Sequence, residues 1–184
     1  MKRLVLLVLG IAAGASGAYA QSNAELIEGA LAAAPVRARD AAAVIQWNAD
    51  FTYETLREGT NRIVCYHRSD EARRQPFAVQ CTSVANLERV AQSRRFRAEA
   101  GQDAAAERAL VDEAEANGTR IAPEFGSFFT SVNGPDQASA RSHTTIAVPG
   151  ATPESLGLPD NPSQGGAWLM AAGTTTAHIM IPGH

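Results

Sequence analysis

Four histidines are the side chains of this sequence best suited to metal binding or to proton transfer near neutral pH. The sequence contains none of the compact spacings typical of metal sites, such as His-Glu-x-x-His or Cys-x-x-Cys. A histidine site would have to be assembled across strands, for example from His67 and His143 with Asp70 or Glu54. The alternative is that the histidines lie on strand faces and make ordinary hydrogen bonds. The four are His67, His143, His178 and His184.

His178 and Met180 form a second candidate, because they alternate with Ile179 and Ile181 along an expected strand. Imidazole and thioether together suit copper, and Met170 on a paired strand would add a third ligand. In the competing interpretation the methionines fill the core and His178 satisfies a buried hydrogen bond. The candidate metal ligands are thus His67, His143, His178 and Met180, and no cofactor is indicated.

Covalent catalysis has little support in the sequence. There is no Gly-x-Ser-x-Gly motif, and the nearest candidates are Ser127 in Gly-Ser-Phe and Ser142 beside His143. Neighbouring residues of a strand point to opposite faces, so Ser142 and His143 would not meet. Lys2 is the only lysine, which excludes a Schiff-base lysine, a phosphate-loop lysine and a Ser-Lys dyad from the rest of the chain. No feature selects a pair of carboxylates for glycoside cleavage.

Two arginine clusters, Arg73-Arg74 and Arg94-Arg95-Arg97, have two interpretations. They form a local patch for an anion, or they are solvated side chains on a loop and a helix, which the flanking acidic residues favour. The chain as a whole has 16 basic and 19 acidic residues. Without Lys2 and Arg3 the remainder carries a net charge of about −5, which argues against a nucleic-acid partner.

The first twenty residues have the pattern of a cleavable signal peptide. Lys2 and Arg3 precede an apolar run from Leu4 to Ala13, and Ala18-Tyr19-Ala20 is typical of a cleavage site. The apolar run is too short to span a bilayer, which takes about 20 residues. The sequence therefore predicts a leader at 1–20 and a periplasmic or secreted location, with no membrane span. An oxidising compartment favours a disulfide between the only two cysteines, Cys65 and Cys81.

The positions of these side chains depend on the helices and strands that the sequence predicts. A helix over 21–34 is followed by strand patterns at 42–47, 51–56, 62–68 and 77–82, of which the first three are interpreted as a meander. Residues 84–117 predict two helices divided near Gly101. Strand patterns return at 125–132 and 143–148, and a Pro/Gly-rich loop over 149–166 precedes a hairpin of 167–172 with 176–181.

Strands, then helices, then strands indicate the α+β class. We expect a single domain over 21–184, an antiparallel sheet with a helical pair on one face, and the central helices between the two strand groups. The terminal hairpin is expected in the middle of the sheet. A Cys65–Cys81 bridge between antiparallel strands would set Ile63 opposite Ser83 and His67 opposite Val79.

Two short segments of the sequence are distinctive. The first is Leu-Arg-Glu-Gly-Thr-Asn at 56–61 followed by the two cysteines, and the second is Trp-Leu-Met at 168–170 with His-Ile-Met-Ile-Pro at 178–182. Together they resemble segments of a group of small exported bacterial proteins. The resemblance implies the disulfide and the terminal hairpin, and it implies no mechanism. The function expected overall is an exported, non-enzymatic module that binds a protein or small-molecule partner. The alternative is an enzyme or metal-binding protein with a histidine and carboxylate site.

Overall fold

The structure is a computed structural model that describes residues 22–181. The expected leader at 1–20 and His184 lie outside the described residues. The helices are α1 (Asn23–Ala30), α2 (Leu87–Ala100), α3 (Ala104–Ala116) and the single turn α4 (Pro153–Leu156). The strands are β1 (Ala43–Trp47), β2 (Tyr53–Arg57), β3 (Ile63–His67), β4 (Phe77–Ser83), β5 (Phe128–Gly134), β6 (Arg141–Ala147), β7 (Trp168–Met170) and β8 (His178–Met180).

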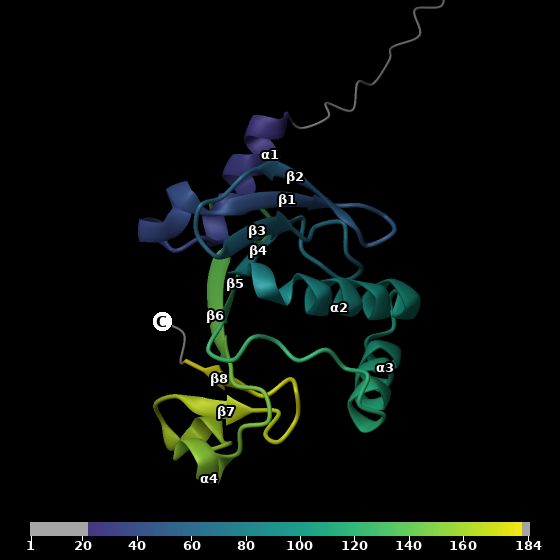
Figure 1. Ribbon diagram of the computed structural model, residues 1–184, viewed down its shortest axis with the longest axis vertical. Helices are drawn as coiled ribbons and strands as arrows, with labels where there is room; N and C mark the ends of the chain where they lie inside the picture. Colours follow the sequence, from purple (N-terminus) through teal and green to yellow (C-terminus); the bar gives the residue numbers. More distant parts are fainter. Residues whose placement is uncertain (1–21, 182–184) are drawn as a thin grey trace, which may run out of the picture.

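The strands form one twisted sheet in the order β2-β1-β3-β4-β5-β6-β8-β7, and the α+β class is confirmed (Figure 1). All neighbours are antiparallel except β1 and β3, which run parallel. The expected meander was therefore wrong, because β3 pairs with β1 and not with β2. The segment between β2 and β3 passes around the start of β1 to allow this pairing.

That crossover contains the motif at 56–61 and explains its residue types. The side chain of Arg57 donates to the backbone oxygens of Arg39 and Ala42. The side-chain amide of Asn61 donates to the backbone oxygen of Ala38. Gly59 approaches so closely that a Cβ there would lie 2.4 Å from the backbone nitrogen of Ala43. The motif thus closes the parallel crossover, which is a structural role.

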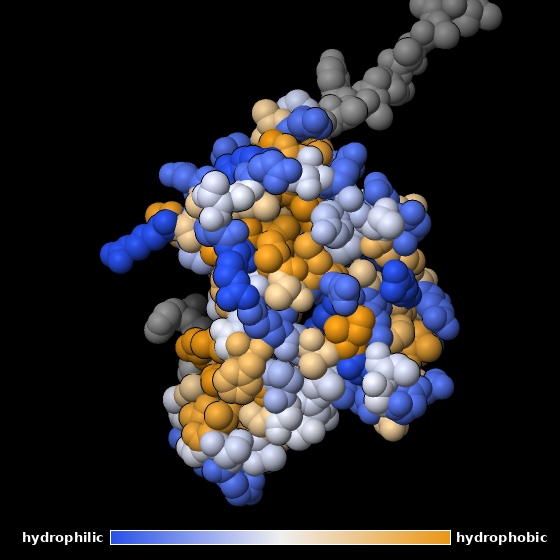
Figure 2. Space-filling model, in the orientation of Figure 1, coloured by the Kyte–Doolittle hydropathy of each residue, from blue (hydrophilic) through white to orange (hydrophobic). Residues whose placement is uncertain are grey.

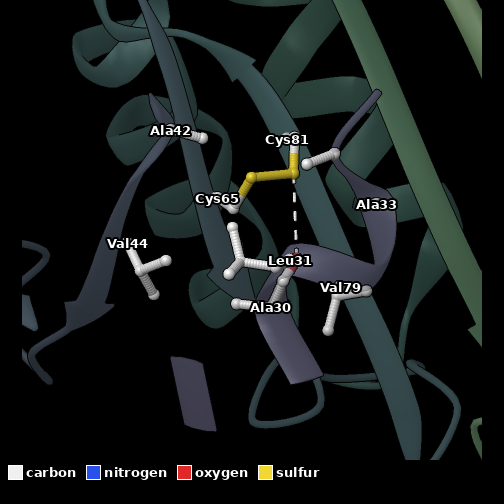
Figure 3. Packing of buried hydrophobic residues seen from close by; sticks show 9 residues of the cluster. Ala30, Leu31, Ala33, Ala42, Val44, Cys65, Val79 and Cys81 are labelled. Atoms are coloured by element: carbon white, nitrogen blue, oxygen red, sulfur yellow. Dashed lines mark hydrogen bonds between the residues drawn. A yellow bond between two sulfur atoms is a disulfide. The ribbon is translucent and has the colours of Figure 1, made fainter. Parts of the chain in front are cut away.

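The middle of the sheet is clamped by the expected disulfide. Cys65 on β3 and Cys81 on β4 are bonded with their Cα atoms 4.1 Å apart, and the expected pairing of Ile63 with Ser83 and His67 with Val79 is confirmed. Leu31, which follows α1, packs over the bridge with Ala30 and Val79 (Figure 3). The 3.7 Å approach of Cys81 Sγ to the Ala30 oxygen is a packing contact, because a disulfide sulfur has no hydrogen to donate.

The two faces of the sheet have different cover. The α1 segment covers the face of the disulfide, whereas α2 covers the opposite face at Ile45, Trp47, Val64 and Tyr66. The helix α1 begins with a capping box in which Ser22 accepts from the Glu25 amide and the Glu25 side chain accepts from Ser22. The α2–α3 pair divides at Gly101, as the sequence predicts.

The terminal hairpin lies at one end of the sheet. β8 pairs with β6 and β7 is the edge strand, so the expected position in the middle of the sheet was wrong. Each strand has only three residues, and their buried side chains belong to a small separate core of Val148, Ala151, Leu169 and Ala177. The lower part of Figure 1 shows this region, with α4 beside the hairpin.

Candidate functional site

A cavity of about 430 Å³ lies between the α2–α3 pair and strands β4, β5, β6 and β8, and we call it the arginine cavity. Figure 2 shows a hollow near the middle of the molecule with strongly hydrophilic side chains at its border. Six arginines line the cavity, against two glutamates, Glu71 and Glu107. The arginines are Arg68, Arg74, Arg89, Arg94, Arg97 and Arg120.

Helix α2 contributes half of these arginines because of its register. Arg89, Ser93 and Arg97 are four residues apart and share one face, and Arg94 lies beside them. Arg89 and Arg94 are each only 7% exposed. Eight residues of helix extend about 12 Å, so α2 places cationic groups along the length of the cavity.

At one end of the cavity the arginines are paired with acids, and we call this part the Glu71 cluster. Glu71 accepts from Arg68 at 2.8 Å and from Arg94 at 2.6 Å, and Arg97 also donates to it. Arg97 reaches Glu107 on α3 at 2.7 Å as well. Asp70 pairs with Arg94, and Arg73 pairs with Glu107. Each of these arginines therefore has a carboxylate partner.

The Glu71 cluster perturbs the ionisation of its members. Burial alone would raise the pKa of Glu71, but the hydrogen bond from Arg68 and the charges of Arg97 and Arg94 outweigh it and lower the pKa to about 2. Burial and the neighbouring charges of Arg68 and Arg97 lower the pKa of Arg74 to about 10. Positive charge is thus crowded here beyond what the carboxylates neutralise.

At the other end, Arg89 and Arg120 form no ion pair with any of the described residues, and we call them the unpaired arginines. Arg89 donates to the Ile121 oxygen and to the hydroxyls of Thr175 at 3.2 Å and Thr176 at 2.9 Å. Arg120 donates to Gln92 Oε1 at 2.7 Å. These partners are neutral, so neither guanidinium charge is balanced by direct contact.

The unpaired arginines keep hydrogen-bonding capacity. Arg120 is 8% exposed, and its buried Nε–H has no acceptor among the described residues; the same holds for Nε–H of Arg94. Burial and the charge of Arg120 lower the pKa of Arg89 to about 10, although Glu115 opposes this. Glu115 approaches through the two hydroxyls of Thr175 and Thr176, to which it is hydrogen-bonded. An anion in the cavity would find both charge and donors here.

The remaining wall of the cavity is apolar. Val90 of α2, Val111 of α3 and Phe129 of β5 line it, with Ala147 and Ala177 beside the strands of the C-terminal part. Ser93 lies among them, but its hydroxyl donates to the Arg89 backbone oxygen and accepts from Arg120. Its proton therefore already has an acceptor, and that acceptor is a backbone oxygen and not a general base.

The structure places the three histidines among the described residues on different strands, β3, β6 and β8. His178 lines the arginine cavity, and its Nδ1 lies 2.7 Å from the Thr176 backbone oxygen, which makes Nδ1 the donor. His67 lies at a separate small pocket beside α1, where Nε2 contacts the Leu26 oxygen at 2.8 Å, and His143 is exposed on β6. Met180 is half-buried on β8. Within residues 22–181, no three His, Cys, Asp or Glu side chains are grouped to hold a metal ion.

The arginines depart from the solvated interpretation. Arg94 is buried over the Trp47 ring, with 5.4 Å between the guanidinium carbon and the ring centroid, whereas Arg95 is exposed as expected. Arg89 and Arg120 carried no signal as site residues. Arg89 lies in the first of the two predicted helices beside the apolar Val90, and nothing else in the sequence indicates that its side chain is buried. Arg120 follows the helix stop at Asn117-Gly118, where nothing local distinguishes it.

Comparison with protein-family models, with curated proteins and with solved structures finds no match to this chain. Functional inference therefore depends on the geometry of the cavity. Among the described residues, no helix has both the length and the apolar character to cross a bilayer.

Proposed function

We propose that this protein is an exported, non-enzymatic module that binds a small organic anion in the arginine cavity. The observation that carries the proposal is the lining itself, with six arginines against two glutamates around about 430 Å³. This volume lies within the range of about 300–1,000 Å³ that is typical of small-molecule pockets. Periplasmic or secreted location is proposed from the leader pattern, and the disulfide supports it.

The energetic argument is that the cavity wall holds positive charges close together and partly desolvated. Burial is the main cause of the lowered pKa values of Arg74 and Arg89, and the neighbouring arginines lower them further. An anion would offset the repulsion and accept charge-assisted hydrogen bonds, which are about twice as strong as neutral ones. Binding is favoured over catalysis because the hydroxyl of Ser93 already donates to a backbone oxygen and has no general base as its acceptor.

The test is a thermal-shift and calorimetric comparison of small carboxylates with their uncharged amides, for example hexanoate and hexanamide. We expect the carboxylate to raise the melting temperature and the amide to leave it unchanged, since a ligand at 100 times its Kd adds about 2.7 kcal/mol. Arg89→Gln and Arg120→Gln should each weaken carboxylate binding at least tenfold.

Arg95→Gln is the matched control, because Arg95 is on the same helix but is exposed and outside the arginine cavity. It should leave carboxylate binding unchanged. The proposal is wrong if no carboxylate stabilises the protein, or if Arg95→Gln weakens binding as much as Arg89→Gln does.

A further inference from the structure

We infer that the ligand is an amphiphilic organic acid, held by one anionic head at the unpaired arginines with an apolar body along Val90, Val111 and Phe129. This inference rests on the proposed function and names the class and orientation of the ligand. The two ends of the cavity differ in how their arginines are paired, which places the anionic head at one end. The apolar wall between them accounts for the apolar body of the ligand.

The head belongs at the unpaired arginines because of the difference in pairing. Arg94 and Arg97 already contact carboxylates of the Glu71 cluster, so an incoming anion would compete with Glu71 and Glu107. Arg89 and Arg120 donate hydrogen bonds only to neutral oxygens among the described residues, and the guanidinium of Arg120 also lies over the Phe96 ring. A ligand carboxylate there gains a charged partner without displacing one.

Donors remain available for this head group. A guanidinium has five N–H groups. Arg89 uses three in its bonds to Ile121, Thr175 and Thr176, and Arg120 uses two in its bonds to Gln92 and Ser93. Two N–H groups of Arg89 and three of Arg120 are therefore unused, and only one of them, the Nε–H of Arg120, is known to be buried away from the cavity. A single carboxylate, with two oxygens, can accept from both side chains.

The body of the ligand is inferred to be apolar because apolar side chains line the cavity away from the unpaired arginines. Val90, Val111 and Phe129 come from three different elements and face the same cavity, with Ala147 and Ala177 behind them. A methylene chain or a ring placed there removes apolar surface from water on both sides. A second charged group would lose its hydration against this wall, and beyond the wall it would compete with Glu71 and Glu107 for arginines that are already paired.

The experiment measures the affinities of acetate, hexanoate, adipate and inorganic phosphate by isothermal titration calorimetry. Hexanoate should bind at least tenfold tighter than acetate, because only hexanoate has a body. It should also bind at least tenfold tighter than adipate, whose second carboxylate meets the apolar wall, and than phosphate.

Two variants locate the ends of the ligand. Arg120→Lys keeps the charge and removes the forked donors, so it should weaken acetate and hexanoate alike. Val111→Thr, a half-buried position on α3, should weaken hexanoate and leave acetate unchanged. The melting temperature without ligand shows that each variant is folded, and Arg95→Gln serves again as the control.

The outcomes separate this inference from the proposed function. Equal affinities for acetate and hexanoate, or tighter binding of adipate or phosphate, overturn the amphiphilic ligand while the anion site stands. An unchanged hexanoate affinity in Val111→Thr overturns the orientation of the body. No heat and no stabilisation with any of the four probes overturns both.

Discussion

Glu71 is the residue on which the paired end of the cavity depends. Its side chain is 4% exposed and contacts four arginines, Arg68, Arg74, Arg94 and Arg97. Buried charges of this kind are tolerated when they are paired, and removal of one partner leaves the others uncompensated. A single carboxylate therefore holds together side chains from the 68–74 loop and from α2.

Glu71→Gln should lower the free energy of unfolding by about 3–5 kcal/mol at pH 7, because several buried guanidinium groups lose their common counter-charge. Urea denaturation measures this change. Glu113→Gln, on the exposed side of α3, is the control and should change stability by less than about 0.5 kcal/mol. A loss in Glu71→Gln no larger than in the control would mean that the cluster contributes no net stability.

The lowered pKa of Glu71 also predicts a dependence of stability on pH. The carboxyl titrates near 4.5 when unfolded and near 2 when folded, so the unfolded state binds the proton first as pH falls. Its contribution is complete above about pH 4.5 and is lost as pH falls towards 2. Denaturation midpoints in this range should fall less steeply in Glu71→Gln than in the wild type. Identical slopes would contradict the assignment.

At the scale of elements, the crossover between β2 and β3 decides which strands pair. Gly59→Ala should destabilise the protein severely, since its Cβ would lie 2.4 Å from the Ala43 nitrogen and backbone atoms cannot yield as a side-chain end can. Chemical denaturation measures the effect. Thr60→Ala, at the next and exposed position, should be nearly neutral. Equal stabilities for the two variants would show that the close approach is not required.

The terminal hairpin should open independently of the disulfide-bonded strands. Leu169 is 1% exposed in the small separate core, so Leu169→Ala should cost about 2–5 kcal/mol locally. Hydrogen exchange should become faster at β7, β8 and residues 148–151, with β3 and β4 unchanged. Met170→Ala, at an exposed neighbour, is the control. Faster exchange in β3 and β4 as well would show a single cooperative unit.

The sequence predicts the elements better than their assembly. Apolar runs between turn residues, with alternation in some of them, located the strands, and the two cysteines set the register of β3 with β4. These signals are local or involve one covalent constraint. The parallel pairing of β1 with β3 is not local, since it depends on the close packing of Gly59 at the start of β1. The hairpin was predicted in the middle of the sheet because its two runs are apolar. In the structure these short strands lie at the end of the sheet, and their apolar side chains bury a small separate core that belongs to neither main cluster.

The candidate site was less predictable than the fold. His178 was identified for its imidazole, and the structure does place it at the cavity, but Arg89 and Arg120 gave no comparable signal. The sequence does not distinguish a buried arginine from a solvated one. Only in the folded chain do α2, the 68–74 loop and residue 120 lie together. The number of acidic neighbours in the sequence was misleading, because Glu71 and Glu107 neutralise arginines in the interior instead of on the surface.

At the scale of the whole molecule, charge is unevenly distributed. The chain carries a net charge of −3, yet the cavity lining has a surplus of arginines over carboxylates. Positive charge is therefore concentrated inside a molecule that is negative overall. This arrangement suits a small anion that enters the cavity and does not suit a large polyanion, which would contact the outer surface.

Loss of the disulfide should affect the stability of the whole molecule. The bridge closes a loop with a sequence separation of 16, which corresponds to about 3 kcal/mol in the chain-entropy account. The double variant Cys65→Ala/Cys81→Ala should unfold at correspondingly lower denaturant, with some further loss from the buried volume removed. Reductant should lower the stability of the wild type and not of the variant. Equal midpoints for the oxidised and reduced wild type would refute this prediction.

The same bridge governs how the chain responds to mechanical tension. If the two ends of the chain are pulled apart, force passes from Cys65 to Cys81 through the sulfur atoms and bypasses the residues between them. The oxidised chain should then extend roughly 50 Å less than the reduced chain, at about 3.3–3.6 Å per residue. The bypassed segment contains Arg68, Glu71 and Arg74. The loop that contributes these three residues to the arginine cavity is therefore not stretched when the two ends of the oxidised chain are pulled apart.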